Sequence, residues 1–259
     1  MYKLESRKML KTFIIAEIGI NHNGDLLNAC ELIKKAKRAG ADAVKFQAAV
    51  PCLVSSRFAK KAGYQKIHTT ENESQLEMIK KLHLPLQAYP KLQRECKKQK
   101  ILFLCSAFDM KSLKFLSTIN LPIYKIPSGE ITNLPYIRFI GSLKKSVILS
   151  SGMANLGEIE NAILNLEQAG TGRKYITVLH CNSEYPTPIS DVNLRAMITI
   201  RKALGVKVGY SDHTLGIEVP TAAVALGATI IEKHLTISRN LSGPDHKSSL
   251  IPEEFAIIT

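Results

Sequence analysis

The feature that most constrains the fold of this chain is an eightfold alternation of short β-branched runs with amphipathic stretches. Stretches such as 26–40 and 156–170 have the apolar spacing of helices, and Gly40 and Gly170 lie where a glycine ends a helix. Parallel strands need crossovers, which helices supply. The pattern therefore predicts an α/β fold, a (β/α)₈ TIM barrel, with an open doubly wound sheet as the alternative. The expected strands are residues 13–19, 43–47, 101–106, 123–128, 146–151, 176–181, 206–211 and 229–234.

The length fits this prediction, because 259 residues is close to the roughly 250 of a single barrel. We therefore expect one catalytic domain over residues 1–259. The long insertion at 51–70 follows the second strand and is expected to form a loop or lid over the site. The segment IPEEFAIIT at 251–259 is predicted to open a short last helix.

Charge and cysteine content narrow the class of protein. The net charge is +13, but the lysines and arginines are dispersed through helical segments with no aromatic-interleaved basic motif, which argues against a nucleic-acid partner. Five scattered cysteines without a CxxC pair indicate reduced thiols in a cytoplasmic protein. The longest apolar runs are too short to cross a membrane, and the N-terminus lacks a signal-peptide cleavage site.

Polar residues follow nearly every predicted strand, at the barrel end where active sites lie. The first strand ends in Glu17 and runs into Asn21-His22-Asn23-Gly24-Asp25, although this stretch is also an ordinary turn and helix N-cap pattern. His180, Asn182, Ser151, Asp212, Glu232 and Lys233 occupy similar places at later strands.

Lys45 and Lys125 each interrupt an apolar strand. A buried lysine is costly unless an anion neutralises it, so both lysines are predicted to face one anionic ligand. The alternative is that they snorkel outward between strand and helix. Hydroxyl groups and the backbone near Gly129 and Gly152 would complete a phosphate or carboxylate site, the hydroxyls coming from Ser106, Ser128, Ser150, Ser183 and Ser211.

His213 and His234 end consecutive predicted strands and should lie side by side. Two neutral imidazoles with open positions suit a catalytic divalent metal, whereas a lone histidine is more often a hydrogen-bonding core residue. Glu17, Glu130 and Asp245 are candidates for sugar binding or proton transfer, the alternative being structural pairing with lysines or loop amides. Cys105 and Cys181 are expected to be small core residues.

Several long motifs resemble the sialic acid synthases, a family that makes N-acetylneuraminate, legionaminate and pseudaminate. They include FIIAEIGINHNGD, AGADAVKFQ, YKIPSGEITNLPYI, LHCNSEYPTP, VGYSDHTLGI and GPDHKSSL, and the similarity runs from about residue 12 to the last residue. The resemblance implies a metal-dependent condensation of phosphoenolpyruvate with the open-chain aldehyde of N-acetylmannosamine or a relative, with phosphate as the leaving group. The legionaminate and pseudaminate alternatives would use a 2,4-diacetamido-trideoxyhexose.

The resemblance also implies individual roles. His213 and His234 match the family's Mn²⁺ (or Mg²⁺ or Co²⁺) ligands, and Glu17, Tyr185 and Asp245 match groups that hold the sugar. Glu130 falls in a site motif and is counted with the catalytic carboxylates. The implied phosphoenolpyruvate contacts are Lys45, Ser106, Lys125, Ser128, Ser150, Ser183 and Ser211.

The sequence departs from the family pattern in two places. Ser106 stands where a threonine is usual, with Cys105 before it, so a hydroxyl is kept. Family members also carry a C-terminal antifreeze-like domain that reaches across a homodimer, and the expectation from this sequence is a barrel without it. That leaves open an inactive or partner-dependent barrel. Two further enzyme classes compete with the nonulosonate synthase: a synthase of 3-deoxy sugar acids and a Schiff-base aldolase using Lys125.

Overall fold

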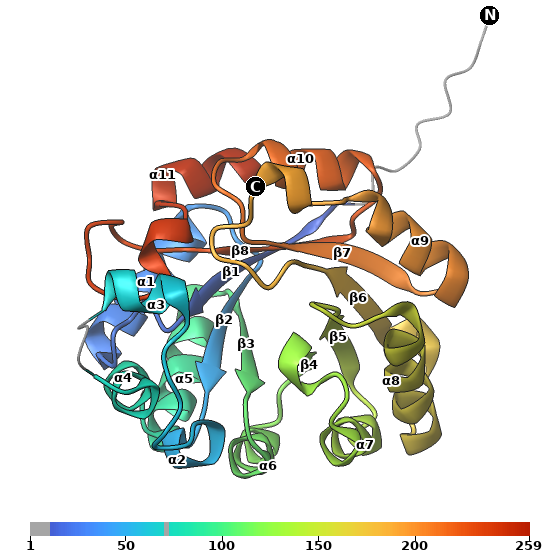
Figure 1. Cartoon of the computed structure of the whole chain (residues 1–259), viewed down its shortest axis with the longest axis horizontal. Helices are drawn as coiled ribbons and strands as arrows, with labels where there is room; N and C mark the ends of the chain where they lie inside the picture. Colours follow the sequence, from blue (N-terminus) through green and yellow to red (C-terminus); the bar gives the residue numbers. More distant parts are fainter. Residues whose placement is uncertain (1–10, 70–72) are drawn as a thin grey trace, which may run out of the picture.

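The computed structural model describes residues 11–69 and 73–259, and over these residues eight parallel strands close into a barrel in sequence order. The strands are β1 (Phe13–Gly19), β2 (Ala43–Ala48), β3 (Leu102–Ala107), β4 (Ile123–Ile126), β5 (Ser146–Ser150), β6 (Ile176–His180), β7 (Lys207–Asp212) and β8 (Ile230–His234). Figure 1 shows them enclosed by helices. The TIM-barrel prediction is confirmed and the open sheet is excluded, because β1 pairs with both β2 and β8.

Helices follow the strands as the sequence pattern predicts. The outer ring consists of α1 (Leu26–Arg38), α5 (Tyr89–Gln99), α6 (Met110–Thr118), α7 (Leu134–Ser142), α8 (Leu156–Ala169), α9 (Arg195–Leu204), α10 (Glu218–Ala225) and the short α11 (Pro252–Phe255). Asp25 caps α1 by accepting from the backbone N–H groups of Leu27 and Asn28, so the turn and N-cap interpretation of this stretch is correct. Gly170 caps α8 at a φ of 122°, and Gly40 follows α1 at a φ of 88°.

The insertion after β2 is helical and not an irregular loop. It contains α2 (Pro51–Val54), α3 (Gly63–His68) and α4 (Gln75–Leu82), which gather on one side of the barrel in Figure 1. Ser74 and Glu77 form a reciprocal capping box that starts α4. The helical periodicity of residues 75–82 was present in the sequence, whereas α2, with 4 residues, and α3, with 6, are too short to show a helical period.

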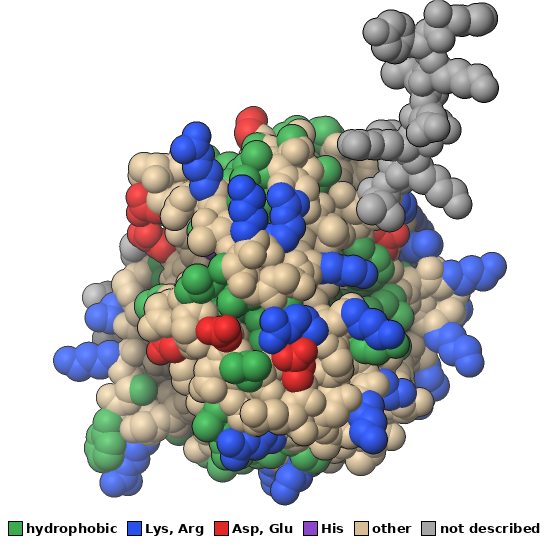
Figure 2. Space-filling view, turned by 90° about the vertical axis from the view of Figure 1, so that its right-hand side faces the viewer, with side chains coloured by type: hydrophobic (Ala, Val, Ile, Leu, Met, Phe, Trp, Pro, Cys, Tyr) green, Lys and Arg blue, Asp and Glu red, His purple; other side chains and the backbone are tan. Residues whose placement is uncertain are grey.

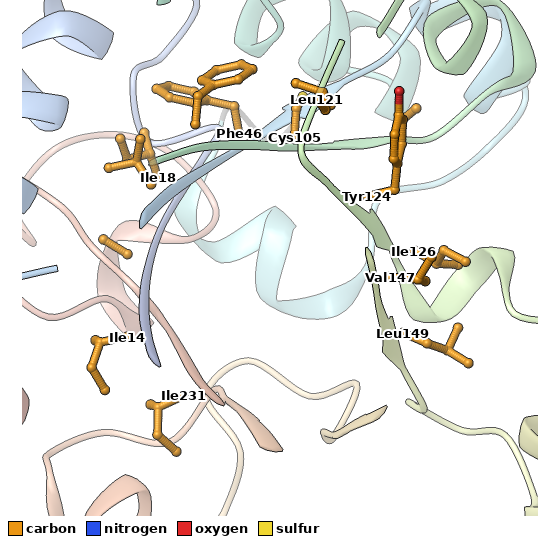
Figure 3. Close-up of a cluster of buried hydrophobic side chains, with 14 of the residues drawn as sticks. Ile14, Ile18, Phe46, Cys105, Leu121, Tyr124, Ile126, Val147, Leu149 and Ile231 are labelled. Atoms are coloured by element: carbon orange, nitrogen blue, oxygen red, sulfur yellow. The ribbon is translucent and has the colours of Figure 1, made fainter. Parts of the chain in front are cut away.

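The apolar core lies in two layers, because side chains alternate between the two faces of each strand. Outward residues pack under the helices, and Figure 3 shows several of them, including Ile14, Phe46, Tyr124, Leu149 and Ile231. A separate inner cluster fills the barrel itself and consists of Ile15, Ala43, Leu104, Ile148, Leu179 and Ile230. This inner cluster forms an apolar floor inside the barrel.

The surface agrees with the expectation that the lysines and arginines are dispersed. Figure 2 shows that on one face Lys and Arg side chains are scattered among other types and do not form a continuous patch.

All five cysteines are free thiols. Within the described part of the chain, no helix is long and apolar enough to span a membrane.

Candidate active site

The candidate site begins one step above the apolar floor of the barrel. Two residues beyond Ile15, Ala43 and Ile230, the same face of each strand carries a charged side chain, because every second residue points inward. The polar residues at this level are Glu17, Lys45, Ser106, Lys125, Ser150, Ser211 and Glu232, all of them buried. The inward orientation of Lys45 and Lys125 rules out snorkelling toward the helices.

These residues form one connected cluster of charges. Lys45 Nζ lies 3.3 Å from Glu17 and 3.0 Å from Glu232. Lys125 Nζ donates to Ser150 Oγ at 2.8 Å and lies 3.6 Å from Glu232. Glu232 also accepts from Ser211 Oγ at 2.9 Å, so its carboxylate bridges both lysines. Glu232 therefore balances part of the positive charge of the two lysines from within the protein.

Burial and neighbouring charges set the protonation states of this cluster. Burial raises the pKa of Glu17 to about 7, although Lys45 opposes the shift. Burial would also raise the pKa of Glu232, but Lys125 and Lys45 outweigh it and lower that pKa. Burial lowers the pKa of Lys125 to about 8, while the carboxylates keep the pKa of Lys45 raised against the same effect. A proton shared among the carboxylates therefore resides on Glu17.

Two of the predicted serines, Ser128 and Ser183, approach each other at Gly152. A Cβ added to Gly152 would lie 2.4 Å from Ser128 Cβ and 3.3 Å from Ser183 Oγ, so glycine is required for these strand ends to approach. Ser106 Oγ is buried and finds no hydrogen-bond partner within residues 11–69 and 73–259. The Gly152 N–H, which we expected to face an anion, instead donates to Cys181 Sγ at 3.3 Å. The role of the backbone amides near Gly129 and Gly152 in holding an anion stays a prediction.

The two histidines lie together above the cluster. The ring centroids of His213 and His234 are 5.6 Å apart, and Tyr185 covers both at 4.1 and 5.9 Å. His213 Nδ1 bonds the backbone oxygen of Asn182 at 2.7 Å, which leaves its Nε2 for another contact. His234 Nδ1 is buried with no partner in the described part of the chain. Burial lowers the pKa of His213 to about 4 and that of His234 further, so both imidazoles are neutral.

A cavity of about 310 Å³ opens beside His234. Tyr185, Asp245 and Gln47 line it on the barrel side, and Gln47 Nε2 donates to Glu17 at 2.9 Å. This size lies at the lower end of small-molecule pockets, which span about 300–1,000 Å³. The cavity is therefore lined by two of the predicted sugar-binding residues, Tyr185 and Asp245, and by one of the predicted metal ligands, His234.

Several candidate residues lie elsewhere. Glu130 is half-buried on the rim, accepts from Asn133 at 2.6 Å and does not line the cavity. Lys233 points outward from the barrel and pairs with Asp212 at 2.5 Å. His180 also points outward, with Nε2 2.8 Å from the oxygen of Val192. A catalytic role for Glu130 stays a prediction, whereas Lys233, Asp212 and His180 have structural partners.

The loop that carries Asp245 is held by the stretch after β1. Asn21 Nδ2 donates to the backbone oxygen of Leu235 and to Ser249 Oγ, both at 2.9 Å. Asn23 Nδ2 donates to the oxygen of Ser242 at 2.8 Å. These asparagines position the loop and do not face the cavity.

The sequence-based reasoning missed four residues of the site. Glu232 was noted at a strand end but given no role, although its position two residues before His234 places it on the same face. Gln47 has the same relation to Lys45 on β2. Tyr64 stacks on Tyr185 at 5.6 Å, and His83 lines the cavity. No local pattern indicates these last two, because they come from the helical insertion.

Asp245 makes a testable contribution to stability. Burial raises its pKa from 3.8 to about 6, so between these values the folded state binds more protons than the unfolded state. Stability is therefore lost as the pH rises through this window. Replacing Asp245 by asparagine is expected to raise the free energy of unfolding at pH 7.5 by on the order of 1–3 kcal/mol, and the gain should vanish near pH 4. Urea unfolding at both pH values measures this, with the exposed Asp191→Asn as control. An equal gain at both pH values would show that charge burial is not its cause.

The barrel and its buried charge cluster define a class: a TIM-barrel protein with its candidate site at the carboxyl ends of the strands. A family model, the NeuB family, matches residues 32–259. The chain belongs to the NeuB family.

Individual relatives support this membership over nearly the whole chain. An N,N'-diacetyllegionaminic acid synthase of Campylobacter jejuni is 53% identical over 250 residues, covering 96% of this chain and 75% of that protein. A protein of the same name from Legionella pneumophila is 46% identical over 244 residues, covering 93% of this chain and 68% of that protein. The crystal structure of N-acetylneuraminic acid synthetase from Leptospira borgpetersenii, in complex with citrate, has a TM-score of 0.83 at 36% identity, covering 95% of this chain and 81% of that one.

Proposed function

We propose that this protein condenses phosphoenolpyruvate with the aldehyde of an N-acyl hexosamine and releases phosphate, forming a nonulosonate. The observation that carries the proposal is the buried pair Lys45 and Lys125, surrounded by serine hydroxyls and lying below two neutral histidines. The names of the relatives, which are synthases of legionaminic and N-acetylneuraminic acid, support it.

The charge cluster suits a small multiply charged anion. Lys45 and Lys125 supply two buried cations, and Ser106, whose Oγ lacks a partner in the described chain, supplies a free hydroxyl. Charge-assisted hydrogen bonds from such groups bind phosphate and carboxylate strongly. The apolar floor beneath them keeps water out and strengthens these interactions.

The proposed reaction balances without an oxidant or reductant. Carbon 3 of phosphoenolpyruvate forms a bond to the aldehyde carbon, and the aldehyde oxygen takes a proton. Water then adds at carbon 2 and gives up one proton, which leaves a hydroxyl on that carbon. The bond between carbon 2 and the phosphate oxygen breaks, carbon 2 becomes a ketone, and the proton of its hydroxyl goes to the departing phosphate. Glu17, held by Gln47 and Lys45, lies where it can hold or move a proton between these sites. Asp245 and Tyr185 orient the sugar from the cavity.

His213 and His234 fit a divalent metal such as Mn²⁺, Mg²⁺ or Co²⁺. Both rings are neutral, His213 Nε2 is left available, and His234 Nδ1 is buried without a partner in the described residues. No group of three or more His, Cys, Asp or Glu in that same part of the chain gathers around a common point, so the remaining positions would go to substrate and water. When bound, such a metal supplies Lewis-acid polarisation of an aldehyde oxygen.

Phosphate release from phosphoenolpyruvate tests the function. With Mn²⁺ and an N-acyl hexosamine we expect release that needs the sugar and stops with EDTA. The His234→Ala variant should lose at least about 10²-fold in kcat, since loss of one electrostatic contact to the reacting oxygen costs this much. It should also bind Mn²⁺ more weakly in a titration followed by electron paramagnetic resonance.

The outward-facing His180 provides the matched control, and His180→Gln should keep its affinity for Mn²⁺. Release with a phosphorylated aldose but with no N-acyl hexosamine would point to a synthase of 3-deoxy sugar acids. Release that persists in EDTA would contradict the metal assignment.

A further inference from the structure

A second cavity lies at the amino-terminal ends of the strands, opposite the candidate site. It measures about 550 Å³ and shares no lining residue with the cavity beside His234. Its walls come from α5, from the start of β3 and from the turn between α6 and β4, and Figure 1 shows α5 and α6 on the outer side of β3. We call this cavity the basal cleft. Its volume lies within the range of small-molecule sites.

The basal cleft follows from the way β3 and β4 pair. β3 pairs with β2 along its whole length, from Leu102 to Ala107, but within the described chain it is in register with β4 only at Ser106 and Lys125. Below that pair no strand ladder holds the start of β3 against the start of β4. Gln93 Nε2 on α5 donates to the Ile119 oxygen at the end of α6 at 2.9 Å, which joins the two helices beside the opening. The cleft is therefore set by the backbone and not by the position of one surface side chain.

The base of the cleft is apolar. Cys96, Ile101 and Phe103 line it, and all three are buried. Burial raises the pKa of the Cys96 thiol, so this side chain stays protonated and behaves as a small apolar group. A ring-shaped apolar group that entered the cleft would lose contact with water against this base, which is favourable.

The rim of the cleft is positively charged. Arg94 and Lys97 are three residues apart on α5, so they lie on neighbouring turns of one face, and both line the cleft. Their side chains make no hydrogen bond or ion pair within residues 11–69 and 73–259. Glu95, the acidic residue of α5, accepts from Gln99 at 2.8 Å and does not line the cleft. The described lining contains no aspartate or glutamate, so these two cations lack a counter-ion there.

The charge of the rim and the apolar base together define a class of ligand. Two cations match a phosphate dianion better than a carboxylate, and a guanidinium can donate two parallel hydrogen bonds to phosphate oxygens. Arg94 and Lys97 are exposed, and exposed ion pairs contribute little by themselves. An anion therefore needs an apolar part that reaches the base.

We propose that the basal cleft is a second ligand site, which binds a small phosphate monoester carrying an apolar ring. The phosphate lies between Arg94 and Lys97, and the ring lies on Cys96, Ile101 and Phe103. This site uses none of the residues assigned to phosphoenolpyruvate, sugar or metal, so it does not depend on the proposed function.

Calorimetric titration of the full chain tests the ligand class. The probes are inorganic phosphate, phenyl phosphate, 1-naphthyl phosphate, 1-naphthoate and 1-naphthol. Affinity should rise at least about threefold at each step from inorganic phosphate to phenyl phosphate and to 1-naphthyl phosphate, because each step adds apolar area. 1-Naphthoate and 1-naphthol should bind about fivefold more weakly than 1-naphthyl phosphate, because they neutralise the rim less.

Variants place the ligand in the cleft. The double variant Arg94→Gln, Lys97→Gln should raise the Kd of 1-naphthyl phosphate about tenfold. Lys91→Gln, Lys98→Gln is the matched control: it removes the same charge from exposed positions of α5 outside the lining, and should stay within about twofold. Lys125→Met should keep the wild-type Kd, because Lys125 belongs to the charge cluster at the other end of the barrel.

Nuclear magnetic resonance of isoleucine methyl groups gives the position independently. 1-Naphthyl phosphate should shift the signals of Ile101 and Ile119, which line the basal cleft, and leave that of Ile79, which lines the cavity beside His234.

Four results would overturn the proposal. The first is the absence of saturable binding of 1-naphthyl phosphate up to about 10 mM. The second is a Kd that rises in Lys125→Met but not in Arg94→Gln, Lys97→Gln, which would place the ligand in the charge cluster. Equal losses in the two double variants on α5 would indicate attraction to the net charge alone. Binding of 1-naphthol as tight as that of 1-naphthyl phosphate would remove the role of the rim.

Discussion

Replacing Lys125 by methionine is expected to lower kcat/KM for phosphoenolpyruvate by about 10²–10³-fold, the usual effect of removing one preorganised electrostatic contact. Lys125 is buried, donates to Ser150 Oγ at 2.8 Å and lies 3.6 Å from Glu232. Methionine keeps the volume but removes the cation that faces the anion. Steady-state phosphate release at varied phosphoenolpyruvate measures the effect, and KM for the sugar should change little.

The exposed Lys114→Met on α6 is the matched control and should keep wild-type kinetics. Lys125→Arg should restore only part of the loss, because the larger guanidinium cannot fit beside Ser150 without displacing it. A Lys125→Met protein with wild-type kcat/KM for phosphoenolpyruvate would refute the assignment of this lysine to anion binding. Trapping of Lys125 by borohydride in the presence of substrate would instead indicate a Schiff base.

The second large effect concerns stability. Lys233 is fully buried on the outer side of β8, where its Nζ contacts Asp212 Oδ2 at 2.5 Å and the Thr214 oxygen at 2.6 Å. Lys233→Met would leave the Asp212 carboxylate buried and unpaired. We expect the free energy of unfolding to fall by about 3–5 kcal/mol, as is usual when one member of a buried ion pair is removed. Urea unfolding followed by circular dichroism gives this value.

The double variant Lys233→Met, Asp212→Leu should recover part of the loss, since no unpaired charge remains. Recovery is incomplete because Asp212 also accepts from the N–H and hydroxyl of Thr214. Lys202→Met at an exposed position serves as control. A double variant less stable than the single one would mean that the hydrogen bonds to Thr214, and not the buried charge, dominate at this site.

The sequence predicted the parts of this protein that follow a short-range period. Lys45 and Lys125 were identified because each interrupts an apolar strand, and His213 and His234 because they end consecutive strands. The structure places these residues on the inward face, since residues two apart on a strand share a face. The same rule would have identified Glu232 from His234, because Ile230, Glu232 and His234 occupy alternate positions of the strand and share its inward face. The closed barrel follows from eight such strands with helical crossovers.

The parts that the sequence did not predict depend on long-range packing. Tyr64 and His83 reach the site only because α3 and α4 pack over the barrel mouth, and no local period indicates that contact. The hydrogen bond donated by the Gly152 N–H is a similar case, because its acceptor, Cys181 Sγ, comes from the residue after the neighbouring strand β6. Burial decides the protonation of Glu17, and burial is a property of the assembled fold.

The cavity beside His234 is lined partly by residues at the ends of the barrel strands and partly by the helices between β2 and β3, and this division has an evolutionary consequence. The groups proposed for anion binding and proton transfer stand on strands, where Lys45 contacts both Glu17 and Glu232 and a change at any one of them disturbs the others. The opposite side of the cavity comes from α2, α3, α4 and His83, which lie between β2 and β3 and outside the barrel strands. Substitutions there can accumulate without disturbing that network. A change in the proposed sugar specificity therefore needs substitutions in this one segment only, while the residues proposed to form the new bond stay unchanged.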